Sequence, residues 1–203
     1  MNYNKYVNLL RSFLVVIILL LGNLASAKAP ESKIITQVEN YLNSFKNFSA
    51  EFEQNDIGHV CHGTLKISKP GKFRWEYDDG KLLIISTGDT IIYVDNELDN
   101  VHYISSDDTI AKFLSQEKIS FSNEEFQIEN MVAHDGEVML LIKNTKDGEL
   151  GKINLGFNIK PISLKSIEVI DANDNIVQLS IKNITYPEKF DPELFNYYEN
   201  HNR

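Results

Sequence analysis

The residues best suited to chemistry stand together in the stretch His59-Val60-Cys61-His62. Imidazole and thiolate groups are ligands that Zn²⁺ prefers. If the stretch is a strand, however, His59 and Cys61 share one face and His62 points to the other. A zinc site takes at least three ligands from the protein, and no second C-x-x-C or H-x-x-x-H pattern supplies the rest. We therefore expect histidines near a turn and a half-buried cysteine, with no metal.

Other catalytic patterns have little support. The sequence has no G-x-S-x-G elbow, no phosphate-binding loop and no dinucleotide fingerprint. The acidic pairs Asp107/Asp108 and Glu124/Glu125 fall in a connecting segment, where charged surface residues are normal and a glycosidase pair would be a guess. We predict that the protein is not an enzyme and has no cofactor. A hydrolase that uses Cys61 or an acidic pair remains an open alternative.

The elements that would position these residues are mostly strands. One helix is predicted at 31–45, because a continuous apolar stripe recurs at helical spacing. The stripe consists of Ile34, Ile35, Val38, Tyr41, Leu42 and Phe45. Alternating or short apolar runs then follow from Phe48 to Ile181, separated by Asp-Gly pairs at 79–80, 135–136 and 147–148. Such turns suit hairpins, so the sequence predicts an antiparallel meander that forms a sheet or barrel.

A second, short helix is expected between the strands that end near Ile104 and begin near Phe126. Ser106, Asp107 or Asp108 could cap it, and its apolar face would carry Ile110, Phe113 and Leu114. A strongly curved sheet with both helices against its concave face is the simplest arrangement.

The stretch Lys69 to Gly80, "KPGKFRWEYDDG", has an unusually bulky face. Phe73, Trp75 and Tyr77 alternate with charged residues, so a strand places the three rings on one side. They could belong to the core, to the wall of a ligand pocket or to a docking surface. Curved sheets with a covered concave face often keep a cavity, which favours a secreted protein that binds apolar ligands.

The N-terminus resembles a cleaved secretory signal peptide. Lys5 and Arg11 precede the apolar run 13–21, and Ala25-Ser26-Ala27 forms a cleavage site. We place residues 1–27 in the signal peptide and residues 28–203 in one domain, an uncleaved anchor being the alternative. Cleavage would remove two basic residues from a chain of net charge −9, which disfavours nucleic acid and anionic membrane surfaces as partners. Cys61 is the only cysteine, so we expect no intrachain disulfide and no lipid anchor near the cleavage site.

Several motifs together resemble the periplasmic outer-membrane lipoprotein carrier family, LolA. They are "FSAEFEQ" at 48–54, "GTLKISKPGKFRWEY" at 63–77, "LLIISTGDTIIYVDNELDNV" at 82–101 and "FDPELFNY" at 190–197. They cover nearly the whole chain after residue 27. The block around Pro70, Phe73 and Trp75 is fairly specific, and the others are supportive.

The resemblance implies a mainly β (α+β), LolA/LolB-like fold: an incomplete antiparallel β-barrel of about 11 strands with helices covering the concave face. It implies a soluble, monomeric periplasmic carrier that binds lipoprotein acyl chains. An inner-membrane ATP-binding-cassette complex would load it, and an outer-membrane receptor would receive the cargo. A general periplasmic lipid-binding protein or chaperone on the same fold is the alternative.

The resemblance also suggests which residues hold the cargo. The family usually has Arg where this chain has Lys69, and that Arg bonds lid carbonyls, so Lys69 is the expected lid latch, with fewer donors. Ile110, Phe113 and Leu114 would form the lid helix. The expected lipid cavity consists of Leu42, Phe45, Leu65, Ile67, Phe73, Trp75, Tyr77, Ile84 and Ile92.

Overall fold

A computed structural model describes residues 28–56, 59–106, 112–122, 124–145, 151–170 and 175–197. The predicted signal peptide, Asp107, Asp108 and Ile110 lie outside these ranges. The chain divides into two compact units, Met1–Gln37 and Val38–Arg203. The sheet and the site described below belong to the second unit. No helix among the described residues is long and apolar enough to cross a membrane.

Helix α2 (Lys28–Asn43) begins and ends slightly earlier than the apolar stripe predicts. Its last turn contains no basic residue. Ser44 closes the end, since its backbone N–H and its hydroxyl both donate to the Tyr41 carbonyl at 3.1 and 2.7 Å. The carbonyls at a helix end carry partial negative charge, so this end can accept a cation from elsewhere in the chain.

Eleven strands confirm the antiparallel prediction. In sheet order they run β6-β5-β4-β3-β2-β1-β11-β10-β9-β8-β7, and the sheet does not close into a barrel. Their bounds are β1 Asn47–Asp56, β2 His59–Ser68, β3 Lys72–Tyr77, β4 Leu82–Thr87, β5 Thr90–Asp95, β6 Asn100–Ser105, β7 Phe126–His134, β8 Glu137–Asn144, β9 Lys152–Ile159, β10 Ile162–Ile170 and β11 Ile176–Thr185. The short helix α3 (Lys112–Ser115) interrupts the meander, and the 3₁₀ helix η3 (Pro192–Phe195) follows β11.

The hairpin chemistry is as predicted at Asp135-Gly136. His134 pairs with Glu137 across this two-residue turn. Both turn residues have positive φ, 48° and 82°, as a type I′ turn requires. The turn therefore fixes which residues of β7 and β8 face the same side.

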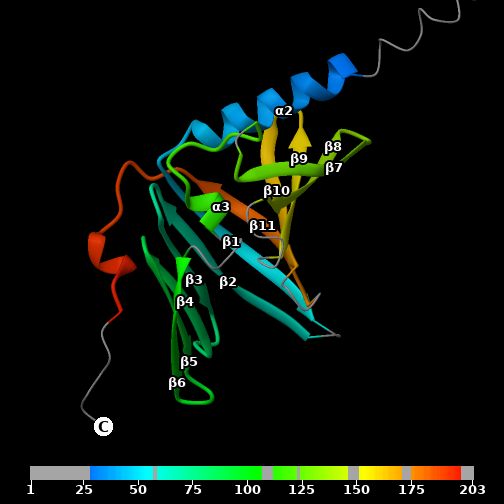
Figure 1. Ribbon diagram of the computed structural model, residues 1–203. Coiled ribbons are helices and arrows are strands. Elements are labelled where there is room, and N and C mark those ends of the chain that lie inside the picture. The colour runs from blue at the N-terminus through cyan, green and yellow to red at the C-terminus, as the bar shows by residue number, and fades with distance from the viewer. Residues whose placement is uncertain are drawn as a thin grey trace, which may run out of the picture. The chain divides into compact units, whose positions relative to one another are not determined.

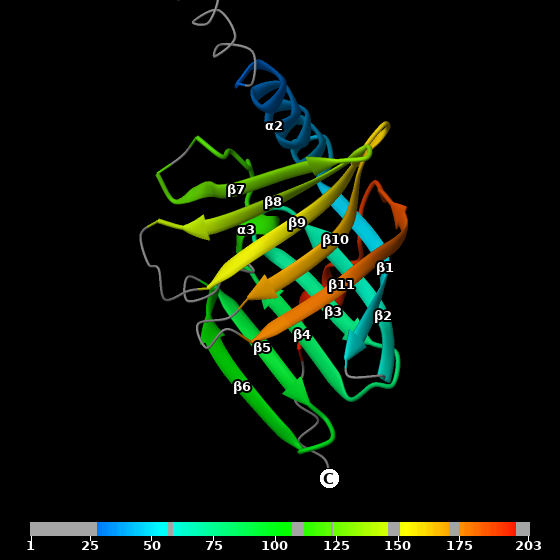
Figure 2. The ribbon, with the colours of Figure 1, turned by 90° about the vertical axis from the view of Figure 1, so that its right-hand side faces the viewer.

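The sheet of the second unit bends so that its two halves face each other. Strand β1 joins the halves, because it pairs with β2 on one side and with β11 on the other. Figures 1 and 2 show β8–β10 crossing over β2–β4 rather than continuing beside them. We call the side between the halves the inner face and the other side the outer face.

The C-terminal segment covers part of the outer face. Arg74 of β3 points outward, where its Nη1 donates to the Leu194 carbonyl of η3 at 3.3 Å and its guanidinium pairs with Glu76. Ile85, which pairs with Arg74 across β3 and β4, is completely buried, and Phe195 is only 2 % exposed. Figure 1 shows η3 and α3 on opposite sides of β3 and β4. The motifs around Phe73 and Phe190 thus meet in space.

Candidate functional site

A small apolar cavity lies on the inner face, between the two halves of the sheet and α3. Its volume is about 20 Å³, which is room for roughly one water molecule. Five of the predicted residues line it, and nearly all of the wall is hydrocarbon. The lining consists of Leu65, Ile67, Phe73, Trp75, Leu114, Ser115, Ile153, Ile167 and Val169.

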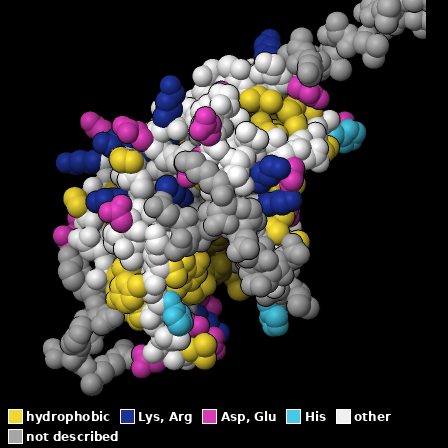
Figure 3. Space-filling view, in the orientation of Figure 1, with side chains coloured by type: hydrophobic (Ala, Val, Ile, Leu, Met, Phe, Trp, Pro, Cys, Tyr) yellow, Lys and Arg dark blue, Asp and Glu magenta, His cyan; other side chains and the backbone are white. Residues whose placement is uncertain are grey.

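The apolar wall continues beyond the cavity towards the edge of the sheet. Cross-strand pairing places Trp75, Ile84 and Tyr93 in one inner-face row over β3, β4 and β5. All three side chains are partly accessible. A second inner-face row runs beside it and ends at Ile104 of β6, which is 37 % exposed. This row consists of Phe73, Ser86, Ile91 and Ile104. Figure 3 shows hydrophobic side chains exposed around a hollow on this side of the molecule.

Tyr77 and Ile84 therefore lie on the predicted inner face, beside the cavity. Ile92 lies on the outer face, because it pairs with Ile85, which pairs with the outward-pointing Arg74. The prediction for Ile92 is wrong because both 91 and 92 are isoleucine, so the side-chain type does not reveal which of them faces inward. Ile91 is the inner-face residue, since it pairs with Ser86 opposite Phe73.

Close packing holds the aromatic strand in place. Phe52 lies directly over Gly63, where an added Cβ would clash with the Phe52 ring and with the Glu76 carbonyl. The freed space lets Phe52 pack edge-on against both Trp75 and Tyr77, at centroid distances of 5.6 and 5.1 Å. Aromatic pairs prefer this edge-to-face geometry. The packing of Phe52 against Trp75 and Tyr77 thus requires a glycine at position 63.

Tyr77 is the last of the three aromatic residues on the inner face of β3, and it has a polar hydroxyl. Its hydroxyl donates to Gln54 Oε1 at 2.5 Å, and burial raises the pKa of Tyr77 to about 12. Cys61 lies nearby on the same face, since it pairs with Gln54. His59 and His62 are exposed. Among the described residues, no group of three or more His, Cys, Asp or Glu side chains could hold a metal ion.

Lys69 occupies a buried corner before β3. The side chain is 5 % exposed. Its Nζ donates to the Leu42 carbonyl at 2.5 Å and lies 4.8 Å from the centre of the Phe45 ring. The cation thus supplies the end of α2 with the positive charge that its last turn lacks. Burial lowers the pKa of Lys69 to about 8.

The bond from this corner to α3 comes from the backbone. The Gly71 N–H donates to the Ser115 carbonyl at 2.7 Å, and the Ser86 hydroxyl donates to the Gly71 carbonyl at 2.6 Å. The Lys69 ammonium instead bonds the end of α2. The latch role predicted for Lys69 remains a prediction, and the observed link to α3 is through Gly71.

The other lid and helix residues separate into two groups. Leu114 lines the cavity, whereas Phe113 is fully buried and packs on Phe121 and Phe126, with ring centres 5.8 and 5.1 Å away. Leu42 and Phe45 do not line the cavity: Leu42 is buried, and Phe45 packs against Phe48 and Tyr186. Both residues contribute to the corner that holds Lys69.

The opposite wall of the cavity could not be predicted from the sequence. Ile153, Ile167 and Val169 come from β9 and β10, whose apolar runs were recognised as strands. Nothing in those runs indicates that they face β2 and β3, because that depends on how far the sheet bends. Ser115 was missed for the same reason.

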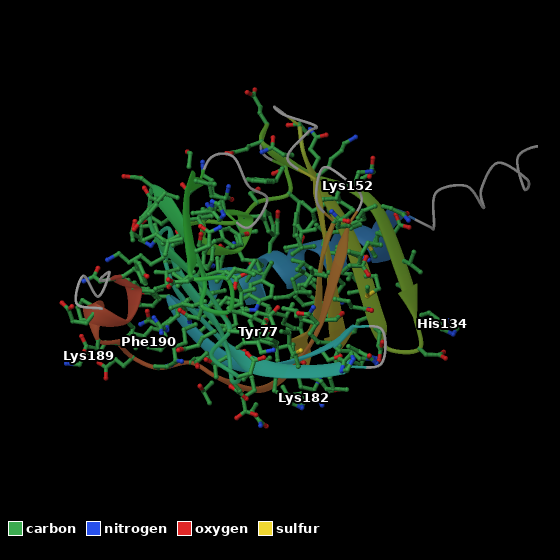
Figure 4. All side chains as sticks on the ribbon, turned by 90° about the horizontal axis from the view of Figure 1, so that it is seen from below. Tyr77, His134, Lys152, Lys182, Lys189 and Phe190 are labelled. Carbon is green, nitrogen blue, oxygen red and sulfur yellow. The ribbon has the colours of Figure 1, made fainter. Side chains whose placement is uncertain are left out.

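The outer face has a different character. A shallow hollow of about 400 Å³ there is lined mostly by polar groups, including Glu51, Glu53, His62 and Lys182. Lys182 pairs with Glu53 at 2.7 Å, and hydrogen bonding from this ammonium lowers the pKa of the Glu53 carboxyl. Figure 4 shows Tyr77 on the inner side of the sheet and Lys182 on the outer side. The inner face is therefore the better candidate for an apolar ligand.

Residues 43–198 match the family described as "Outer membrane lipoprotein carrier protein LolA". An uncharacterized protein of Rickettsia prowazekii is 30 % identical over 188 residues, which cover 91 % of this chain and 85 % of that protein. An outer-membrane lipoprotein carrier protein of Cupriavidus necator is 28 % identical over 159 residues, covering 71 % and 74 %.

Shorter and more distant similarities are also found. An outer-membrane lipoprotein carrier protein of Coxiella burnetii is 32 % identical over 85 residues, which cover 38 % of this chain and 40 % of that protein. Among solved structures, a LolA superfamily protein from Nitrosomonas europaea is similar with a TM-score of 0.47 at 8 % identity, covering 82 % of this chain and 97 % of that chain.

Proposed function

Because the chain belongs to the LolA family of outer-membrane lipoprotein carrier proteins, we propose that it carries lipoproteins by binding their acyl chains. The observation that carries the proposal is the row of apolar and aromatic side chains on the inner face, from Leu65 and Trp75 at the cavity to Tyr93 on β5. Proteins of this family are carriers found in the periplasm, so we place this chain there, after removal of residues 1–27.

The energetic demand on such a carrier is large. At about 0.8 kcal/mol per CH₂, an acyl chain of roughly 15 carbons costs on the order of 10 kcal/mol to expose to water. The carrier must offset much of this and still release its cargo. A shallow apolar wall with a movable cover meets both needs better than a deep, tight pocket.

A cavity of about 20 Å³ is too small for an acyl chain, so binding requires α3 to move. Leu114 and Ser115 cover the space above Trp75, and α3 is only four residues long. The Gly71–Ser115 bond and the packing of Phe113 hold this cover. Net intramolecular hydrogen bonds contribute roughly 1 kcal/mol each, which is small beside the gain from burying an acyl chain. The acyl chain can therefore displace Leu114 and Ser115 and occupy the inner face.

The cargo would come from an inner-membrane ATP-binding-cassette complex and pass to an outer-membrane receptor. Release is favourable when the receptor offers the same chains a site of higher affinity. The carrier needs no chemical step for this transfer, which agrees with the absence of catalytic patterns in the sequence.

Binding of a fluorescent dipalmitoylated lipopeptide tests the proposal. Trp75→Glu places a charge in the wall of the cavity, and we expect at least a tenfold loss of affinity with the fold retained. Val132→Glu is the matched control, because Val132 is 55 % exposed and pairs with Met139, next to the inward Leu140. Equal affinity of the wild type and Trp75→Glu would contradict binding at the inner face.

A further inference from the structure

The apolar wall contains one polar atom without a partner. The indole N–H of Trp75 is buried, and no acceptor among the described residues bonds it. Buried Trp N–H groups normally find an acceptor, so each exception requires an explanation. Trp75 also lies where the cavity meets the rest of the inner face, because it lines the cavity and pairs with Ile84.

The groups around the indole do not supply the acceptor. Phe52 packs edge-on against the ring and carries no acceptor. Burial raises the pKa of Tyr77 to about 12, and the Trp75 indole N–H lies close enough to the Tyr77 oxygen to oppose that rise as a hydrogen-bond donor would, but the pair does not reach the distance and angle of a hydrogen bond. The Tyr77 hydroxyl donates its own proton to Gln54 Oε1, and its oxygen accepts no hydrogen bond from the indole N–H.

A ligand can satisfy this donor only if it brings an oxygen into the apolar site. A plain hydrocarbon cannot, whereas an ester or amide carbonyl at the head of an acyl chain can. We infer that Trp75 donates a hydrogen bond from its indole N–H to a carbonyl oxygen of the bound acyl group. The inference rests on the proposed function and adds to it: the site selects acyl chains over alkyl chains and fixes their head at Trp75.

Two lipopeptides of the same sequence separate carbonyl recognition from hydrocarbon binding. One carries two palmitoyl chains through ester bonds, and the other carries two hexadecyl chains through ether bonds. The wild type should bind the ester form about tenfold more tightly, because a carbonyl oxygen is a much stronger acceptor for the buried donor than an ether oxygen. Trp75→Phe keeps an aromatic ring without the N–H, and it should bind the two lipopeptides equally well.

The matched control is Tyr103→Phe. This variant also removes one polar hydrogen from a ring, but Tyr103 pairs with Ile92 on the outer face. It should keep the tenfold preference. A preference that persists in Trp75→Phe, or a wild type without any preference, would overturn the inference while leaving the carrier function intact. A wild type that binds neither lipopeptide would instead refute the proposed function.

The indole resonance gives a readout that does not depend on the variant's folding. Trp75 is the only Trp, so an amide spectrum of ¹⁵N-labelled protein contains a single indole N–H signal. The ester lipopeptide should move this proton downfield relative to the ether lipopeptide, as a new hydrogen bond requires. Identical indole shifts with both lipopeptides would overturn the inference.

Discussion

At the scale of single residues, Lys69 shows what a motif can and cannot predict. Its position beside Pro70 marked it as important, and it is indeed the buried cation of the site region. Its acceptor, the Leu42 carbonyl, lies 27 residues earlier in the chain and depends on where α2 ends. No local pattern contains that information.

Lys69 should make stability depend on pH. Its pKa is about 8 in the folded protein against 10.5 for the ordinary side chain, so the unfolded chain binds more protons between these values. Stability therefore rises with pH across this window. The difference in unfolding free energy between the wild type and Lys69→Met should grow by about 2–3 kcal/mol from pH 7.5 to 10.

Urea unfolding at several pH values measures this difference. Lys118→Met is the control, because Lys118 is exposed and its removal uncovers no buried charge. A difference between the wild type and Lys69→Met that stays constant with pH would show that the Lys69 ammonium is not desolvated in the folded protein.

Gly63 should tolerate no larger side chain. Gly63→Ala places a methyl group against the Phe52 ring and the Glu76 carbonyl, which cannot both move away. We expect a loss of about 1–3 kcal/mol in unfolding free energy, typical of overpacking. Thr64→Ala, on the opposite face of β2, should change it by no more than about 0.5 kcal/mol. Equal stability of the two variants in urea would mean that Phe52 does not pack over Gly63.

At the scale of elements, period and turn chemistry predicted most of the sheet. Asp135-Gly136 fixed a hairpin, and the alternation of Phe73, Trp75 and Tyr77 predicted their common face correctly. The apolar pair Ile91-Ile92 gave no such signal, because both side chains are buried, Ile91 on the inner face and Ile92 on the outer face. The wall from β9 and β10 required long-range pairing, which local patterns do not contain.

The attachment of α3 should depend on Ser86. Its hydroxyl is the donor to the Gly71 carbonyl, and Gly71 in turn holds Ser115. Ser86→Ala removes this donor from the partly buried Gly71 carbonyl, so the corner should loosen. We expect the Gly71 amide to exchange with solvent at least tenfold faster, as measured by hydrogen exchange. Thr87→Ala, at an exposed neighbouring position, should leave this rate unchanged, and unchanged protection in Ser86→Ala would exclude Ser86 as a support of α3.

At the scale of the whole molecule, the carrier function requires an open sheet with one apolar inner face. Family membership supports the carrier role, while the bend of the sheet explains how short apolar runs become a single surface. A general lipid-binding protein on the same fold would use the same surface. The two differ in cargo, because a carrier must hold the acyl chains of an intact lipoprotein.

The most direct test is the release of a lipoprotein from inner-membrane vesicles that contain the matching ATP-binding-cassette complex. With ATP and the purified protein, we predict that the lipoprotein leaves the membrane pellet in a soluble complex, which mass spectrometry identifies as one carrier with one acylated lipoprotein. Val132→Glu should release the same amount, and Trp75→Glu should release none. A lipoprotein that stays in the pellet, while the soluble protein carries only free lipid, would contradict the carrier function.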